Sequence, residues 1–200
     1  MSRKSTKDKR REELLPQIAD AFAELGYRKA TTSQIASRCG VQETILYRLW
    51  DDKKSMFLKS IEYLFDFRMK RIRSVLAKVP EGEDHLSYLI EDVASTLGKH
   101  GLQRVIYAAL GEIADPEISG ELQKMYRHNY ELILKLLHQS TAADGPPSPA
   151  KVEDTAWATI GLVTILDLSS TLELLGPRQR SQVFKTRYKS AALISAMRSK

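Results

Sequence analysis

A short segment of this chain, Gln42–Arg48, carries side chains of the types that recognise nucleic-acid bases. An amide such as Gln42 can pair with adenine, a carboxylate such as Glu43 can accept from cytosine, and a guanidinium such as Arg48 can pair with guanine. Thr44 can contact the methyl group of thymine. Other roles suit the same side chains: Arg48 can bind phosphate, Glu43 can be a solvated charge or ion-pair partner, and Tyr47 can be a packing aromatic.

Base recognition needs these side chains on one exposed helix face, and the preceding residues predict how that face is built. Thr31 and Gln34 have the spacing of a capping box, which predicts a helix from about Thr32 to Arg38. Gly40 follows where the helix must end in a left-handed conformation, which costs other residues roughly 1 kcal/mol or more. The inward-facing residues of this helix are expected to be Ile35, Ala36 and Cys39.

A second short helix after Gly40 is expected to pack its apolar side against the first one. Its inward residues are Val41, Ile45 or Leu46, and Leu49. The polar set is then left facing solvent, so the segment reads as a helix-turn-helix whose second helix would enter a major groove.

Another helix is expected before this pair, ending at Gly26 and packing across both. Its apolar positions recur at helical spacing and are Leu14, Leu15, Ile18, Ala21, Phe22 and Leu25. Pro16 suits the first turn, so the helix is expected to start near Glu12; a longer, kinked helix is the alternative.

The positive charge of the chain is concentrated at its N-terminal end. Of a net charge of +6, residues 1–60 contribute 13 Lys and Arg against 8 Asp and Glu, and the remainder 18 against 17. Residues 1–11 read either as a flexible arm along DNA phosphates or as a solvated tail. Their charged residues are Arg3, Lys4, Lys7, Lys9, Arg10 and Arg11 against Asp8.

Residues 10–60 resemble the TetR/AcrR family of bacterial transcriptional regulators. The positions in register are Gly26-Tyr27, Thr31, Ile35-Ala36, Gly40-Val41, Leu46-Tyr47, Trp50, Lys53 and Phe57. The resemblance implies that Thr31 and Tyr47 bond phosphate. The chain departs from the family pattern at Glu43, Ile45 and Leu49, where the family often has lysine, a small residue, and His or Tyr; these departures put the affinity for each half-site in doubt.

Phosphate neutralisation is expected to supply much of the affinity, through Lys53 and the amides that start the second and fourth helices. The predicted DNA-binding residues are Thr31, Thr32, Ser33, Gln42, Glu43, Thr44, Tyr47, Arg48 and Lys53.

The rest of the chain shows helical patterns and no pattern typical of strands. After Asp51-Asp52, which can cap a helix, a long pattern runs from Met56 to Val79 and stops at Pro80. Further helices are expected at about 84–98, 101–113, 117–140, 152–175 and 179–197, with a Pro-rich loop at 141–150. The sequence therefore predicts an all-α fold of about nine helices. Residues 1–52 would form a three-helix DNA-binding domain and residues 53–200 a helical ligand-binding and dimerisation domain.

Residues 152–175 are mostly apolar, but Asp167 near their middle argues against a membrane span. Such a helix must be buried by more than one neighbour. The resemblance implies that the last two helices form a two-fold four-helix bundle, so we expect a homodimer. The predicted interface residues are Ile160, Val163, Thr164, Leu168, Phe184, Tyr188 and Ala191.

The resemblance, and an apolar bundle with a few polar groups facing inward, also predict a small-molecule effector. The candidate pocket residues are Tyr63, Phe67, Tyr88, Arg104, Tyr107, Tyr126, His128, Trp157 and Asp167. The family's usual logic favours a repressor released from a palindromic operator by its ligand. The sign of regulation, the operator and the effector stay open.

Competing classes find little support in the sequence. An enzyme would need a motif such as HExxH, GxSxG or a phosphate loop, and none occurs; no His has a Glu three residues before it, as in a di-iron bundle. We therefore expect no catalysis, cofactor or metal. Cys39, the single cysteine, is expected to be a small core residue, and a lone cysteine without a signal peptide favours the cytoplasm. A constitutive DNA-binding architectural protein without effector is a further alternative.

Overall fold

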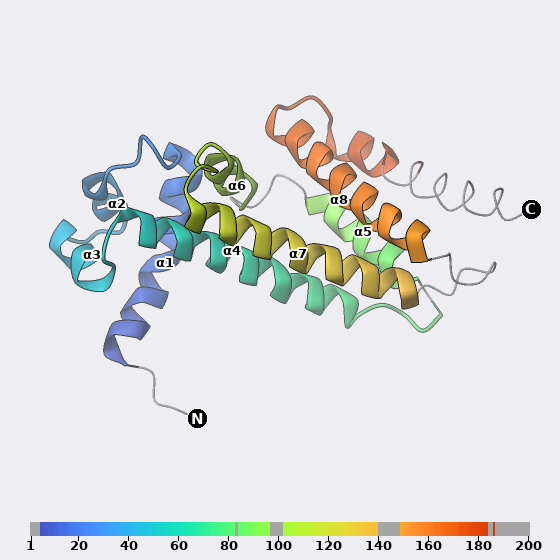
Figure 1. The fold of residues 1–200 in the computed structure, drawn as a ribbon, viewed down its shortest axis with the longest axis horizontal. Helices are drawn as coiled ribbons and strands as arrows, with labels where there is room; N and C mark the ends of the chain where they lie inside the picture. Colours follow the sequence, from blue (N-terminus) through green and yellow to red (C-terminus); the bar gives the residue numbers. More distant parts are fainter. Residues whose placement is uncertain (1–4, 83, 97–101, 140–148, 184–185, 187–200) are drawn as a thin grey trace, which may run out of the picture. The chain divides into compact units, whose positions relative to one another are not determined.

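The computed structural model describes residues 5–82, 84–96, 102–139, 149–183 and 186 (Figure 1). The described residues contain helices and no strand. The helices are α1 (Thr6–Leu25), α2 (Thr32–Arg38), α3 (Glu43–Leu49), α4 (Lys53–Leu76), α5 (His85–Thr96), α6 (Leu102–Leu110), α7 (Pro116–Gln139) and α8 (Pro149–Thr171). Residues 177–183 begin a further helix. The predicted all-α fold of about nine helices is confirmed.

The chain divides into two compact units. Unit 1 contains residues 1–69 and 101–125, and unit 2 contains residues 70–100 and 126–200. Unit 1 therefore joins the three N-terminal helices to the first part of α4, to α6 and to the start of α7. The boundary expected between residues 52 and 53 divides the DNA-binding domain from the ligand-binding and dimerisation domain. It stays a prediction.

An aromatic cluster forms the centre of unit 1. The Phe22 ring meets the Phe57 ring edge to face at 5.0 Å between centroids, and Tyr27 lies 4.7 Å from Phe57. Helices α1 and α6 are also in contact within this unit. The fully buried side chains of unit 1 include Ile18, Ile35, Leu46, Met56, Ile61, Val105 and Ile106. Residues far apart in the sequence thus share one core.

The start of α1 differs from the expectation. The helix begins at Thr6 rather than near Glu12, and Pro16 lies inside it. Ser5 caps the helix, because its hydroxyl oxygen accepts from the Asp8 amide at 3.1 Å. The longer helix weighed as the alternative is the correct one. Residues 6–11 are therefore helical and not a flexible arm; residues 1–4 lie outside the described residues.

The turn between α2 and α3 agrees with the prediction. Gly40 has φ +62°, in the left-handed region, and its backbone amide donates to the Ser37 carbonyl at 3.2 Å. The next amide, from Val41, donates to Ala36 at 3.0 Å, which closes the end of α2. The sharp exit at Gly40 sets the direction in which α3 leaves α2.

Unit 2 contains the end of α4, together with α5, most of α7 and α8. The Arg71 guanidinium donates to both carboxylate oxygens of Asp92 at 3.0 and 2.9 Å, which ties α4 to α5. The apolar core of the unit includes Ile72, Leu86, Leu89, Leu136, Leu137, Val152, Ala156, Ile160 and Leu166. Among the described helices, none combines the length and the apolar character that crossing a lipid bilayer requires.

Replacing Gly40 with alanine is expected to lower the free energy of unfolding by about 1 kcal/mol or more, because an L-residue is strained at positive φ. A new Cβ would meet no atom within 4 Å, so the loss measures backbone strain alone. Urea denaturation at a fixed chain concentration gives the value.

Gly120→Ala is the matched control. Gly120 lies inside α7 and also has no atom within 4 Å of a new Cβ. Alanine there is expected to raise stability by about 0.5–1 kcal/mol. Equal effects of the two substitutions would contradict the backbone explanation.

Candidate nucleic-acid interface

The N-terminus of α2 is held by a reciprocal pair of hydrogen bonds. The Gln34 backbone amide donates to the Thr31 hydroxyl oxygen at 3.2 Å, and the Thr31 backbone amide donates to the Gln34 side-chain oxygen at 3.0 Å. This is the predicted capping box. It fixes the first turn of α2, and Thr31 and Ser33 are exposed there while Thr32 is half-buried.

Tyr47 connects α3 to this same turn. Its hydroxyl donates to the Thr32 hydroxyl oxygen at 3.2 Å, and 53% of the side chain remains exposed. The bond brings the predicted phosphate-binding residues Thr31, Thr32 and Tyr47 together on one surface. Hydroxyl groups clustered in this way suit hydrogen bonds to phosphate oxygens.

The two sides of α3 differ as the sequence predicts. Leu46 and Leu49 are buried, with 0% and 6% of their surface exposed. The exposed positions of the segment are Gln42, Thr44, Tyr47 and Arg48. Glu43, which is half-buried, occupies the first turn of α3, where a carboxylate interacts favourably with the helix dipole. The exposed face therefore carries an amide, a hydroxyl, a phenol and a guanidinium.

Arg11 bonds to the C-terminal end of α3, a role that the sequence did not suggest. Its Nε donates to the Leu49 carbonyl oxygen at 2.7 Å. The last carbonyls of a helix lack partners within it, and a cation is favourable beside them. Arg11 stands three residues before the buried Leu14, so helical spacing could have identified it had α1 been expected to start earlier.

Lys53, predicted to bind phosphate, already has partners within the chain. Its ammonium donates to the Tyr27 carbonyl at 2.9 Å and to the Ala30 carbonyl at 3.1 Å, and lies 4.6 Å from the centre of the Tyr27 ring. These contacts fix the loop between α1 and α2 against the start of α4. Contact with DNA through the remaining N–H stays a prediction.

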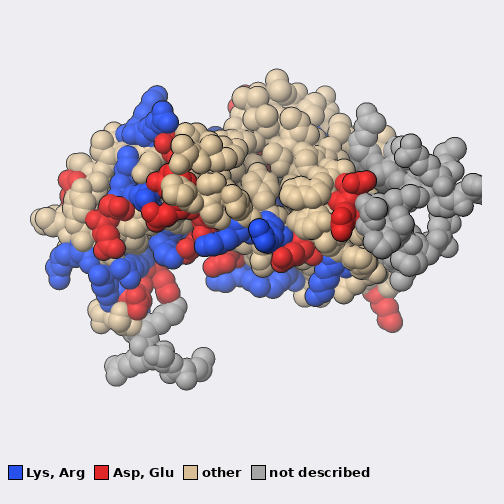
Figure 2. Space-filling view, viewed as in Figure 1, with Lys and Arg blue, Asp and Glu red and all other residues tan. Residues whose placement is uncertain are grey.

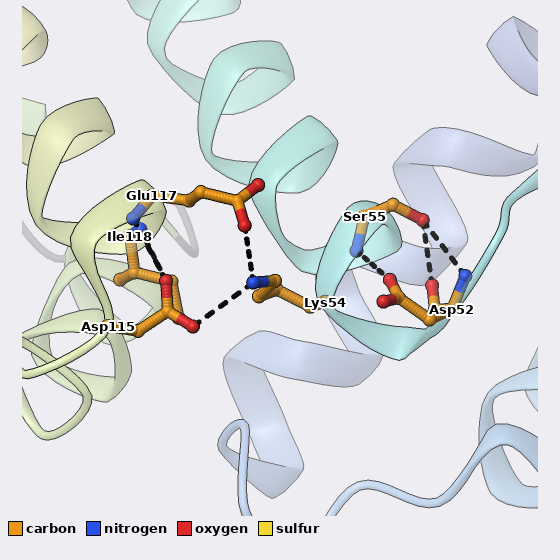
Figure 3. Close-up of polar contacts among 6 residues, drawn as sticks. All are labelled: Asp52, Lys54, Ser55, Asp115, Glu117 and Ile118. Carbon is orange, nitrogen blue, oxygen red and sulfur yellow. Dashed lines mark hydrogen bonds and ion pairs between the residues drawn. The ribbon is translucent and has the colours of Figure 1, made fainter.

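The start of α4 is attached to α7 through Lys54 (Figure 3). Asp52 caps α4 by accepting from the Ser55 amide at 2.6 Å. The adjacent Lys54 ammonium donates to Glu117 at 2.5 Å and to Asp115 at 3.2 Å. Bonds to the Glu117 and Asp115 carboxylates raise the pKa of Lys54, and the Ile118 backbone amide chiefly lowers the pKa of Asp115. The ion pairs therefore persist near neutral pH.

A second cationic side chain, that of Arg28 in the loop between α1 and α2, contacts the residues that directly follow α6. Arg28 donates to Glu112 at 2.5 Å and to the Gly111 carbonyl at 3.2 Å. Together with Lys54, it joins the loop before α2 and the start of α4 to residues 111–117. These pairs have no local sequence signal, because more than 60 residues separate the partners.

Cationic side chains gather on the surface of the N-terminal helices. On the face drawn in Figure 2, Lys and Arg side chains cluster, with a few acidic ones, over the region of α1 and α3. Lys and Arg side chains therefore lie beside the exposed face of α3, which favours a polyanionic partner.

Residues 14–59, which form this interface, match the family model of bacterial regulatory proteins of the tetR family. Those residues are therefore a DNA-binding domain of the tetR type. TetR proteins are DNA-binding transcriptional regulators, so the exposed face of α3 is its candidate DNA-reading surface.

The similarity of this chain to other proteins extends beyond that domain. It is 26% identical to the nucleoid occlusion factor SlmA of Yersinia enterocolitica over 145 residues, which cover 72% of this chain and 73% of that protein. A transcriptional regulator from Pseudomonas aeruginosa PAO1 shares the fold with a TM-score of 0.80, 20% identity and coverage of 98% and 97% of the two chains. A regulator from Saccharomonospora viridis in complex with choline gives a TM-score of 0.76 at 18% identity, covering 90% and 95%.

The predicted effector-binding residues are divided between the two units. Unit 1 holds Tyr63, Phe67, Arg104 and Tyr107, and unit 2 holds Tyr88, Tyr126, His128, Trp157 and Asp167. Asp167 is buried with 8% exposure, whereas Trp157 is 54% exposed and stacks on Tyr130 at 5.0 Å between ring centroids. A shared role for these residues stays a prediction.

The predicted dimer residues on α8 are only partly exposed in one chain. Ile160 is 8% exposed, and Val163, Thr164 and Leu168 are half-buried. Phe184, Tyr188 and Ala191 lie outside the described residues. A different row, spaced by four residues, is exposed on α8: Trp157, Gly161 and Ile165. We call this row the α8 stripe; the sequence did not single it out because α8 is apolar on nearly every side.

Cys39 is buried with 8% exposure, as predicted for a small core residue. Burial raises the pKa of its thiol, so little nucleophilic thiolate forms near neutral pH. The residue packs the turn of the DNA-binding domain.

Lys53→Met is expected to destabilise the protein by about 1–3 kcal/mol, because two partly buried carbonyl oxygens lose their donor. Thermal unfolding at a fixed chain concentration measures the effect. Lys59→Met is the control. Lys59 lies on the same helix, and within the described part of the chain its ion pair is the exposed one with Glu62, so its loss is expected to change stability by less than about 0.5 kcal/mol. A Lys53 variant as stable as the Lys59 variant would show that the two bonds do not hold the loop.

Proposed function

We propose that this chain is a homodimeric repressor that binds a palindromic operator in the cytoplasm and leaves it when a small molecule binds. The observation that carries the proposal is the exposed polar face of α3. Its apolar side is buried, and two side-chain bonds, from Tyr47 to Thr32 and from Arg11 to Leu49, hold its C-terminal half. A helix presented in this way can enter the major groove as a preformed unit.

Contacts to DNA divide into two sets. The side chains of Gln42, Glu43, Thr44 and Arg48 meet base edges and supply sequence preference. The residues that meet phosphate are Thr31, Thr32, Ser33, Tyr47 and Lys53. The second set fixes the register of α3 on the duplex and carries no sequence information by itself.

A second copy of the chain is the proposed occupant of the α8 stripe. Trp157 and Ile165 are 54% and 56% exposed, and Gly161 between them lets another helix approach closely. A two-fold dimer would present two α3 helices to half-sites about one helical turn apart, roughly 34 Å. Because each short α3 makes few contacts, two half-sites together supply the affinity.

The effector is proposed to bind among the helices of unit 2. That unit has an apolar core containing the buried polar groups Asn129 and Asp167, which are 8% exposed each. Pockets of this composition orient small ligands through a few polar groups. The Saccharomonospora viridis regulator, of similar fold, holds choline. A ligand releases the operator if it binds more tightly to a state in which the α3 spacing is wrong.

The likeness to SlmA supports a second candidate, a nucleoid occlusion factor. Such a role needs the same DNA-reading face but no release by an effector. The two candidates differ in where the DNA sites lie: a repressor occupies few sites close to promoters, and a nucleoid-associated factor occupies many sites along a chromosome.

Selection of bound fragments from genomic DNA at moderate salt tests the proposal. We expect enrichment of a palindrome whose half-site centres lie about one helical turn apart. The genomic positions of the recovered sites separate the two candidates. Absence of any enriched sequence would refute sequence-specific binding by this chain.

Ile165→Glu then tests the dimer on the recovered palindrome. A carboxylate in the α8 stripe is expected to yield monomers and to abolish binding to the palindrome. Ile113→Glu is the control, because Ile113 is 57% exposed against 56% for Ile165 and lies after α6, outside the stripe. Light scattering gives the oligomeric state, and undiminished palindrome binding by a monomer would contradict the dimer.

A further inference from the structure

The first turns of α1 lie outside the core of unit 1. None of residues 5–13 is buried, and burial begins at Leu14. In Figure 1 this N-terminal part of α1, drawn in the darkest blue, extends beyond the helices it packs against. The Ser5 hydroxyl accepts from the Asp8 amide and donates to the Asp8 carboxylate at 2.7 Å, so the extension is a capped helix. A capped helix holds its side chains in fixed directions.

One row of this extension points toward the side of α1 on which α3 packs. Positions 7, 11, 14 and 18 share a helix face, since they are spaced by three or four residues. Leu14 and Ile18 on that face are buried, and Arg11 bonds to the Leu49 carbonyl at the end of α3. Lys7 is the next residue of the row, about 6 Å further along the helix axis.

Of the four cations in residues 7–11, two already have partners. Arg10 pairs with Glu13 at 2.8 Å, and Arg11 bonds to Leu49 and lies 3.4 Å from Asp8. Lys7 and Lys9 are exposed and make no ion pair with any described residue. They face different ways, because two residues correspond to a rotation of roughly 200° about the helix axis.

We propose that Lys7 binds a backbone phosphate of duplex DNA beside the end of the segment read by α3. The proposal rests on the proposed function, because it requires α3 to dock on DNA. The Arg11 bond to Leu49 fixes the first turns of α1 against the end of α3. When α3 enters the major groove, the adjacent turn of α1 brings Lys7 to the DNA backbone that flanks the groove. Lys9, on the far side of α1, makes no contact with DNA.

A phosphate contact has a characteristic signature. Each phosphate neutralised releases condensed counterions, so one contact contributes about 0.9 to the slope of log K against log salt. Such a contact affects all sequences alike, because phosphates carry no sequence information. Loss of Lys7 should therefore change the salt dependence of binding without changing the preferred bases.

The experiment compares full-length wild type, Lys7→Gln and Lys9→Gln, which lose the same charge two residues apart. Fluorescence anisotropy on the selected palindrome is measured over a range of KCl concentrations. Two chains bind one palindrome. Lys7→Gln is therefore expected to reduce the steepness of the plot of log K against log salt by about 1.8, at about 0.9 for each chain. Lys9→Gln is expected to keep the wild-type slope. Circular dichroism confirms that both variants keep their helix content.

An unchanged slope for Lys7→Gln would overturn the inference. Equal losses for Lys7→Gln and Lys9→Gln would also overturn it, because they would indicate diffuse attraction instead of a directed contact. If the wild-type protein enriches no sequence in the selection from genomic DNA, the proposed function itself is refuted. The two failures are therefore distinguishable, because the selection tests the proposed function and the salt titrations test the Lys7 contact.

Discussion

The shortness of α3 is the constraint on which the rest of the interface depends. A helix of seven residues is not stable in water by itself, since helices shorter than about 12 residues are marginal. Its shape and direction come from its neighbours: burial of Leu46 and Leu49, the Arg11 bond at its end, and the Tyr47 bond to Thr32. Leu46 and Leu49 are buried and Arg11 bonds at the last residue of α3, while Gln42, Thr44 and Arg48 remain exposed. Support for the helix therefore leaves its reading face free.

That dependence extends beyond the three N-terminal helices. Unit 1 includes α6 and the start of α7, and Arg28 and Lys54 bond to residues 111–117. Exposed ion pairs each contribute little to stability, commonly less than about 1 kcal/mol. They act here by positioning, because several such bonds fix the start of α4 and the loop before α2 against the same segment, residues 111–117. The position of α3 thus depends on residues 111–117, which are more than 60 residues further along the chain than α3.

Local signals in the sequence predicted local structure well. The capping box of Thr31 and the positive φ of Gly40 follow from residues within one turn, and both are confirmed. The predicted start of α1 was wrong because Pro16 suggested a first turn, whereas the helix begins at Thr6 after the cap at Ser5. Lys54 and its partners could not be found from periodicity, since contact requires the tertiary fold. The residues that contact DNA and effector stay predictions, because side-chain type does not fix what a surface binds.

Recognition of base edges by the exposed face of α3 is the central proposal for this protein. The most direct measurement is the affinity of wild type, Gln42→Ala, Thr44→Ala and Arg48→Ala for every single-base variant of the selected operator. A side chain that contacts a base should, when removed, erase about 1–3 kcal/mol of discrimination at one base pair in each half-site. We expect this result for at least one of the three variants. Uniform weakening across all operators by all three variants would contradict it.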